Sequence, residues 1–274
     1  MIMLKTNKDI DGIRESSSLL VRTHAEIAKF IKPGVSSDFL DKKAEEFIRD
    51  NGALPAFKGY NNFPNTLCVS PNDEVVHGLP NNKKIKSGTI LSIDCGVIKN
   101  GYFSDCAFTY EVGEVSDEKK QLLEVTRKCL DLAVAAVNVG GYIGDIGFTI
   151  QNYAEFFGFS VVRELVGHGV GFNLHEAPEV PNYGKKGEGV LIKPGLVLAI
   201  EPMINYGDKD IVSLQNDKTI EFIKYSMEYE LQDFLIMPPA YYKNNTEDGV
   251  FKFYAQIIKN IPKVKIILYN FEKL

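Results

Sequence analysis

The strongest structural constraint in the sequence lies between residues 89 and 110, where two apolar segments flank an Asn100-Gly101 pair. Asn-Gly is favoured in two-residue hairpin loops, because both central positions of a type I′ turn require a positive φ. A loop of this length places Lys99 opposite Tyr102 and Gly96 opposite Asp105. The sequence therefore predicts an antiparallel hairpin with a defined register.

This register places two carboxylates on one face of the hairpin. Asp94 lies two residues before Gly96, so Asp94 and Asp105 become diagonal neighbours unless a bulge shifts the register by one. The opposite face of the first strand carries side chains that suit a core, namely Leu91, Ile93, Cys95 and Val97. Two like charges at this spacing are costly unless a cation lies between them. A metal ion, a protonated carboxyl and a solvated sheet edge all remain open here.

Apolar periodicity predicts helices on both sides of the hairpin. The expected helices cover residues 6–31, a segment capped by Ser36 or Ser37, and residues 117–138 and 143–157; further strands are expected near 160–165 and 196–201. His24 lies on the apolar face of the first helix, and we expect it to be structural. With no low-complexity linker or short repeat, one mixed α/β domain is expected.

The chain contains four histidines, and three of them lie beside glycine- or proline-rich segments. His168 lies in Gly-His-Gly-Val-Gly, His175 precedes Glu-Ala-Pro, and His77 precedes Gly-Leu-Pro. Small neighbours expose an imidazole and let other groups approach the backbone. A lone histidine is more often structural, but three in such settings favour a functional site.

Glu201 ends a short apolar segment, where a charge is costly unless it is paired or bound to a metal. The alternative is the exposed end of a surface strand. Together with Asp94, Asp105 and one imidazole, Glu201 completes an oxygen-rich donor set. Such a set suits Mn²⁺, Co²⁺, Fe²⁺ or Zn²⁺ better than a thiolate-seeking ion.

Composition argues against several other classes of protein. The net charge of −5 provides no basic footprint for nucleic acid. The N-terminal segment lacks the apolar core of a signal peptide, and no apolar stretch approaches the roughly 18 residues of a membrane helix. The four cysteines form no C-x-x-C pair, so we expect reduced, mostly buried thiols rather than a structural zinc site. A cytoplasmic protein is expected.

Six motifs resemble those of the bacterial type I methionine aminopeptidases. They are VVHGLP at 75–80, SIDCGV at 92–97, GYFSDCAF at 101–108, GHGVG at 167–171, LHEAPEVPNYG at 174–184 and AIEPM at 199–203. The resemblance implies the pita-bread α/β fold, in which two related halves pack around an antiparallel sheet flanked by helices. It implies a metallopeptidase domain over residues 1–216 and a divergent C-terminal segment, residues 217–274, that partly completes it. The lack of an added N-terminal domain or of a long insertion before Glu201 favours type I over prolidase-like relatives.

The resemblance also implies a metal-binding role for each matched acid and for one histidine. Asp94 is similar to the bidentate ligand of one ion, and Asp105 to the carboxylate that bridges both ions. His168 is similar to the imidazole ligand, and Glu201 to a ligand of the same ion that also carries a proton to the leaving amine. Two divalent ions are thus expected, of Co²⁺, Mn²⁺, Fe²⁺ or Zn²⁺.

The substrate-contacting residues are implied in the same way. His175 is similar to the residue that contacts the scissile carbonyl or its tetrahedral intermediate, and His77 to the residue near the scissile amide nitrogen. Four residues match positions that line the family's methionine pocket: Tyr60, Phe63, Cys68 and Leu174. Leu174 replaces the usual aromatic residue, a modest change of pocket shape.

The resemblance weakens beyond about Asn216. The family continues with a tryptophan and then a segment like S-A-x-[FY]-E-H-T, whose glutamate bridges both ions, whereas this chain contains no tryptophan. The nearest match places the bridging acid at Glu230, followed by Leu231 in place of histidine. Glu228, Glu221 or no glutamate are the alternatives, and residues 218–274 are also compatible with an out-of-frame or recombined end.

The resemblance implies removal of the N-terminal methionine from nascent proteins and peptides. The expected partners are a peptide or a nascent polypeptide at the ribosome, with no direct contact to nucleic acid or membrane, and the expected state is a monomer. Two alternatives follow from the same motifs. One is a catalytically impaired relative that acts as a binding protein, and the other is an Xaa-Pro peptidase of the same fold.

Overall fold

The predicted hairpin forms the central element of the structure, a computed structural model. Strand β3 (Thr89–Lys99) pairs antiparallel with β4 (Tyr102–Val112), with Lys99 opposite Tyr102 and Gly96 opposite Asp105. Asn100 and Gly101 have φ values of 53° and 83°, the positive pair that a type I′ turn requires. The predicted register is confirmed, and no bulge separates the two carboxylates.

The structure describes residues 2–209 and, beyond them, residues 211, 227, 233–236, 254–255, 257–259, 261 and 265–268. The chain divides into two compact units, Met1–Lys209 and Asp210–Leu274. In addition to the hairpin, the first unit contains α1 (Asn7–Ala28), α2 (Ser37–Asp50), β1 (Leu54–Pro55), the 3-10 turn η1 (Tyr60–Asn62), β2 (Leu67–Pro71), α3 (Asp117–Ala136), α4 (Ile143–Phe156), β5 (Ser160–Val161), β6 (Gly167–Gly169), β7 (Glu176–Val180), β8 (Leu198–Ala199) and β9 (Ile204–Asn205).

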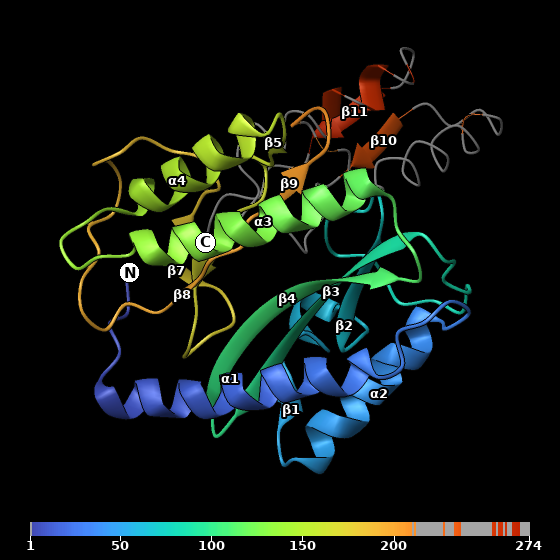
Figure 1. The fold of residues 1–274 in the computed structure, drawn as a ribbon, viewed down its shortest axis with the longest axis horizontal. Coiled ribbons are helices and arrows are strands. Elements are labelled where there is room, and N and C mark those ends of the chain that lie inside the picture. Colours follow the sequence, from blue (N-terminus) through green and yellow to red (C-terminus); the bar gives the residue numbers. More distant parts are fainter. Residues whose placement is uncertain are drawn as a thin grey trace. The chain divides into compact units, whose positions relative to one another are not determined.

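Helices α1 and α2 cover one face of the sheet formed by β1, β2, β3 and β4 (Figure 1). The face of β3 that was expected to be apolar packs against the buried apolar side chains of both helices. The shared core consists mainly of Leu91, Ile93, Cys95 and Val97 from β3, Leu19, Leu20 and Ile27 from α1, and Leu40, Ala44 and Ile48 from α2. Because side chains alternate along a strand, Asp94 projects from the other face of β3.

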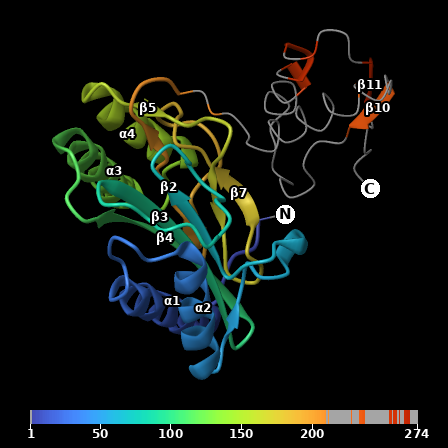
Figure 2. The same cartoon turned by 90° about the vertical axis from the view of Figure 1, so that its right-hand side faces the viewer.

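Helices α3 and α4 lie side by side and form the second half of the unit with short strands (Figure 2). Strands β7, β6 and β8 form one small antiparallel sheet, and β5 pairs antiparallel with β9. A second core joins this half and includes Cys129 of α3, Ile146 and Ile150 of α4, and Val161 and Val180. Each half therefore combines a helix pair with antiparallel strands.

Most expected elements are confirmed, but the strands of the second half are much shorter than expected. Residues 160–165 and 196–201 contribute only β5 and β8, with two residues each. Pairing nevertheless continues irregularly, because the Val162 amide donates to the Met203 carbonyl at 2.9 Å. The structural role expected for His24 is confirmed: its buried ring lies 2.9 Å from the Cys106 carbonyl oxygen and 3.1 Å from the Tyr110 hydroxyl.

In the second unit, β10 (Asp233–Ile236) pairs parallel with β11 (Lys265–Leu268). The boundary expected after Asn216 and the candidate ligand Glu230 lie outside the described residues. Across the part of the chain that the structure describes, no helix has the length and apolar character needed to cross a membrane. All four cysteines are free, and three are buried.

Truncating the core face of β3 should destabilise the protein. Leu91→Ala removes a fully buried side chain, so the free energy of unfolding should fall by about 2–5 kcal/mol. Leu130→Ala makes the same chemical change at a 37% exposed position on α3 and should cost about 0.5 kcal/mol or less. Urea denaturation measures both values. Equal losses would contradict the placement of Leu91 in the core.

Candidate metal centre

Two acidic side chains meet on the hairpin face that points away from α1 and α2. Asp94 comes from β3 and Asp105 from β4, and their carboxyl groups contact each other. The side chain of Asp105 is only 8% exposed. The diagonal pair predicted from the register is therefore present, in an environment with little solvent to screen it.

His168 approaches these carboxylates from β6, which runs between β7 and β8. A side chain at Gly167 would meet the Ala199 carbonyl oxygen at 2.4 Å, and one at Gly169 would meet the Ala177 carbonyl oxygen at 2.6 Å. The glycines on either side of His168 therefore let both neighbouring strands approach closely. This close approach is what the Gly-His-Gly sequence indicated.

The imidazole of His168 is oriented toward the acids. Its Nδ1 lies 2.9 Å from the Gly169 carbonyl oxygen, to which it donates a hydrogen bond. That bond directs Nε2 into the cluster, 3.5 Å from Oδ2 of Asp105 and 3.2 Å from Oε1 of Glu201. A backbone acceptor on one ring nitrogen is the usual way in which a protein presents the other nitrogen to a metal.

Glu201 completes the group from the segment that follows β8. Ala199 of that strand pairs with His168. Glu201 follows Ala199 by two residues, so its carboxylate lies near the His168 ring. Oε1 of Glu201 is buried and has no hydrogen-bond partner with suitable geometry among the described residues. The three carboxylates and the imidazole expected from separate parts of the sequence thus converge.

The proximity of these groups changes their protonation. Burial raises the pKa of Asp94 well above its ordinary value, and the charges of Asp105 and Glu201 raise it further. Burial and the charge of Asp105 also raise the pKa of Glu201, against the opposing contact with His168. Burial lowers the pKa of His168, but its contacts with Asp105 and Glu201 outweigh this and raise it to about 10.

The donor set fits divalent metal ions. Three carboxylates and one imidazole are hard and borderline ligands, which suit Mn²⁺, Fe²⁺, Co²⁺ and Zn²⁺. A cation among them would relieve the repulsion that raises the carboxyl pKa values, and Oε1 of Glu201, which has no well-aligned hydrogen bond among the described residues, could serve as one of its ligands. One ligand atom each from Asp105, His168 and His175 lies within 4.8 Å of the other two.

Two further histidines border this cluster. His175 lies beside His168, with ring centroids 4.3 Å apart, and its Nδ1 is 3.0 Å from the Tyr60 hydroxyl. Burial and the positive charges of His168 and His77 lower the pKa of His175 to about 4, so its ring is neutral at pH 7. His77 adopts a left-handed φ of 60°, a strained conformation for a non-glycine residue that is frequent at functional sites.

An apolar cluster adjoins the acids and contains every residue expected to line a methionine pocket. Cys68 of β2 stands opposite Asp94 in the sheet, and Leu174 immediately precedes His175. The cluster consists of Ala56, Phe57, Cys68 and Leu174, with Tyr60, Phe63, Ile98 and Phe103 packed against it. Phe103 was not anticipated, although strand alternation places it on the same face as Asp105. Phe57 lies between β1 and β2 and carries no periodic signal.

Comparison with known proteins identifies the family. The model of metallopeptidase family M24 matches residues 11–224. The chain belongs to this family. It is 47% identical over 220 residues to "Methionine aminopeptidase 1" of Bacillus subtilis strain 168, a match that covers 80% of this chain and 89% of the relative.

Solved structures of M24 relatives agree with this assignment. The methionine aminopeptidase of Rickettsia prowazekii superposes with a TM-score of 0.77 at 39% identity, over 78% of this chain and 87% of that one. The enzyme of Thermotoga maritima gives 0.76 at 40% identity, with the same coverages. The pita-bread fold expected from the motifs is confirmed, and membership of a metallopeptidase family implies divalent metal cofactors.

Metal binding should be coupled to proton release. The raised pKa values of Asp94, Glu201 and His168 mean that the metal-free site holds protons that a cation must displace. The apparent affinity for Mn²⁺ should therefore rise with pH up to about 10, the pKa of His168. Calorimetry in buffers of different ionisation enthalpy measures the protons released.

Asp94→Asn should weaken Mn²⁺ binding and reduce the proton release, because it removes a carboxylate from the cluster. Asp131→Asn makes the same change at an exposed position on α3 and should leave both quantities unchanged. Binding of Mn²⁺ to the unaltered protein that is independent of pH and releases no protons would contradict the proposed ligand set.

Proposed function

We propose that the chain is a methionine aminopeptidase, which hydrolyses the first peptide bond of nascent proteins and peptides that begin with methionine. One observation carries the proposal: a largely buried cluster of three carboxylates and an imidazole adjoins an apolar side-chain cluster of suitable composition. The identity to proteins named methionine aminopeptidase supports it. The proposed setting is the cytoplasm, where a monomer acts on polypeptides that emerge from the ribosome, without direct contact to nucleic acid or membrane.

Asp94, Asp105, His168 and Glu201 are the proposed ligands of two divalent ions, of Co²⁺, Mn²⁺, Fe²⁺ or Zn²⁺. Asp105 is proposed as the shared ligand because it lies next to Asp94 and also close to His168. Glu230 is the proposed second shared ligand from the C-terminal segment. When bound, the ions supply a nucleophilic water at neutral pH and polarise the scissile carbonyl.

His175 is proposed to stabilise the negative charge that develops on the carbonyl oxygen. Nδ1 of His175 lies 3.0 Å from the Tyr60 hydroxyl, and in the proposed arrangement the hydroxyl is the donor, so the neutral ring carries its proton on Nε2. An N–H group held in this way needs no reorganisation as the charge develops. His77 is proposed to lie near the scissile amide nitrogen, and Glu201 to carry the proton that the leaving amine must gain.

Selectivity is proposed to come from the apolar cluster. Cys68, Phe63 and Leu174 provide an uncharged surface, to which the flexible thioether of methionine is well suited. The Leu174 side chain is shorter than an aromatic side chain. The pocket is therefore proposed to have a somewhat different shape from that of relatives with an aromatic residue at this position.

The direct test mixes the purified protein with Mn²⁺ or Co²⁺ and the peptide Met-Ala-Ser, and measures free methionine. His175→Ala should lower kcat by about 10²–10³-fold, because it removes the donor to the developing oxyanion. The variant should still bind Mn²⁺ with the stoichiometry of the unaltered protein, which separates a substrate role from a ligand role. An Xaa-Pro dipeptide assayed in parallel distinguishes a prolidase-like activity.

Absence of methionine release with either metal would overturn the proposed activity. If the protein then binds metal stoichiometrically but releases no methionine, an impaired enzyme is favoured. If it binds no metal, a binding protein is favoured.

The role of Glu230 can be tested against its neighbours. Glu230→Gln removes the charge of the proposed shared ligand and should weaken Mn²⁺ binding by about tenfold or more. Glu228→Gln and Glu221→Gln serve as matched controls and should bind Mn²⁺ normally. If one of the control variants loses Mn²⁺ affinity and Glu230→Gln does not, the residue changed in that control is the shared ligand.

A further inference from the structure

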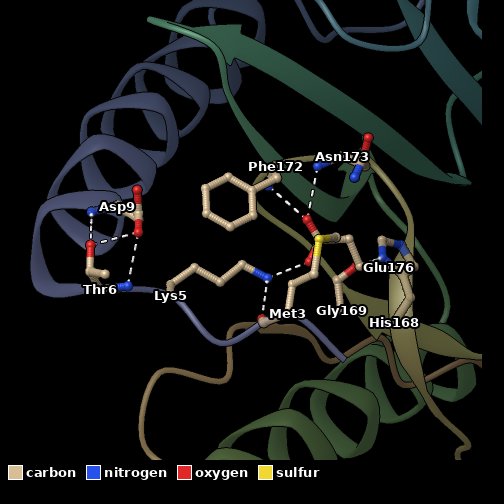
Figure 3. A network of polar contacts seen from close by, with 9 residues as sticks. All are labelled: Met3, Lys5, Thr6, Asp9, His168, Gly169, Phe172, Asn173 and Glu176. Carbon is tan, nitrogen blue, oxygen red and sulfur yellow. Dashed lines mark hydrogen bonds and ion pairs between the residues drawn. The ribbon is translucent and has the colours of Figure 1, made fainter. Parts of the chain in front are cut away.

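A lysine at the start of the chain is buried, and none of its contacts within the described part of the chain is with a candidate metal ligand. Lys5 lies just before α1, and its side chain is only 1% exposed. Its ammonium group pairs with Oε2 of Glu176, whose side chain is fully buried, and donates to the Met3 carbonyl at 3.0 Å (Figure 3). A buried ion pair contributes little net stability compared with apolar side chains of the same size, so stability alone does not account for it.

The segment that carries Lys5 is fixed at both ends. The Lys5 amide donates to the Gly195 carbonyl at 2.7 Å. On the other side, Thr6 and Asp9 form a capping box at the start of α1, with the Thr6 amide 2.9 Å from Oδ2 of Asp9. The ammonium group is therefore attached to an element that is itself held in place.

The partner carboxylate binds a loop beside the candidate metal centre. Oε1 of Glu176 accepts hydrogen bonds from the amides of Phe172 and Asn173 at 2.7 and 2.9 Å (Figure 3). One carboxylate thus connects Lys5 to a loop that closes on itself between residues 172 and 176. This loop contains Leu174 and His175.

The same loop is linked to the hairpin. The Phe103 amide of β4 donates to the Gly171 carbonyl at 2.7 Å, two residues before Asp105. A side chain at Gly171 would meet Cε of Lys5 at 2.9 Å, so the aliphatic part of the lysine lies directly against the loop. Glu176 also stands opposite Gly169, at the irregularity of β6 that follows His168.

We propose that Lys5 is a positioning residue for the aminopeptidase reaction. Through Glu176 it holds the loop of residues 172–176, which keeps His175 beside His168 and Leu174 in the apolar cluster. Lys5 acts through the loop rather than on substrate. The kinetic consequence rests on the proposed function, whereas the structural consequence for His175 does not.

The test replaces the ammonium group with a neutral side chain of similar length, Lys5→Met. The ring of His175 can be followed by ¹⁵N NMR of histidine-labelled, metal-free protein, which contains four histidines. The His175 signals should shift or broaden, while those of His24 stay unchanged. Lys8→Met, the same change at an exposed position near the start of α1, should leave all four unchanged.

In the kinetic arm, Lys5→Met should lower kcat on Met-Ala-Ser by about ten- to a hundredfold, because small displacements of a reacting group are costly. Its affinity for Mn²⁺ should be retained, since the metal ligands are untouched. Lys5→Arg keeps the charge and should recover part of the rate. An unchanged His175 signal in a folded Lys5→Met protein would overturn the proposal, as would a loss of kcat that simply follows a loss of Mn²⁺.

If Lys5→Met fails to fold, the double variant Lys5→Met/Glu176→Gln avoids an unpaired buried charge and should be stable. Its kcat should nevertheless stay low, because the loop is no longer tied to the N-terminal segment. Full recovery of kcat together with stability would show that the pair has a purely structural role. If the unaltered protein releases no methionine, the proposed function fails, while the NMR comparison still decides the positioning role.

Discussion

The main physical constraint on the first unit is electrostatic: several carboxylates are enclosed in a region with little solvent, where their charges must be neutralised. Asp94, Asp105 and Glu201 come from three separate strands or strand ends and are brought together with one imidazole. Like charges at these distances are unfavourable unless protons or cations neutralise them. The family to which the chain belongs uses divalent metals, and the geometry of the cluster is consistent with that chemistry.

The fold distributes the components of this site between its two halves. The hairpin of the first half provides a rigid frame for Asp94 and Asp105, because its other face is anchored in the core under α1 and α2. The second half provides His168 and Glu201 from short strands that are tied to each other by backbone pairing. Since neither half contains the full donor set, the site exists only when both halves are folded together.

Around the charged cluster, hydrogen bonds to backbone and side chains determine how each imidazole is presented. The Gly169 carbonyl orients His168, and the Tyr60 hydroxyl orients His175. The ion pair of Lys5 with Glu176 extends this support to the start of the chain. Residues that never touch a reacting group can thus determine whether the reacting groups are correctly placed.

The sequence by itself determined the hairpin, its register and the shared face of its two acids, because the Asn-Gly turn and strand alternation are local effects. It also gave the positions of the helices. The family resemblance implied that His168 and Glu201 lie near that face. Their orientation there, the burial of Lys5 and the membership of Phe57 in the apolar cluster were decided only by the tertiary structure. Such contacts join residues far apart in the chain, and local periodicity carries no information about which distant segments pack together.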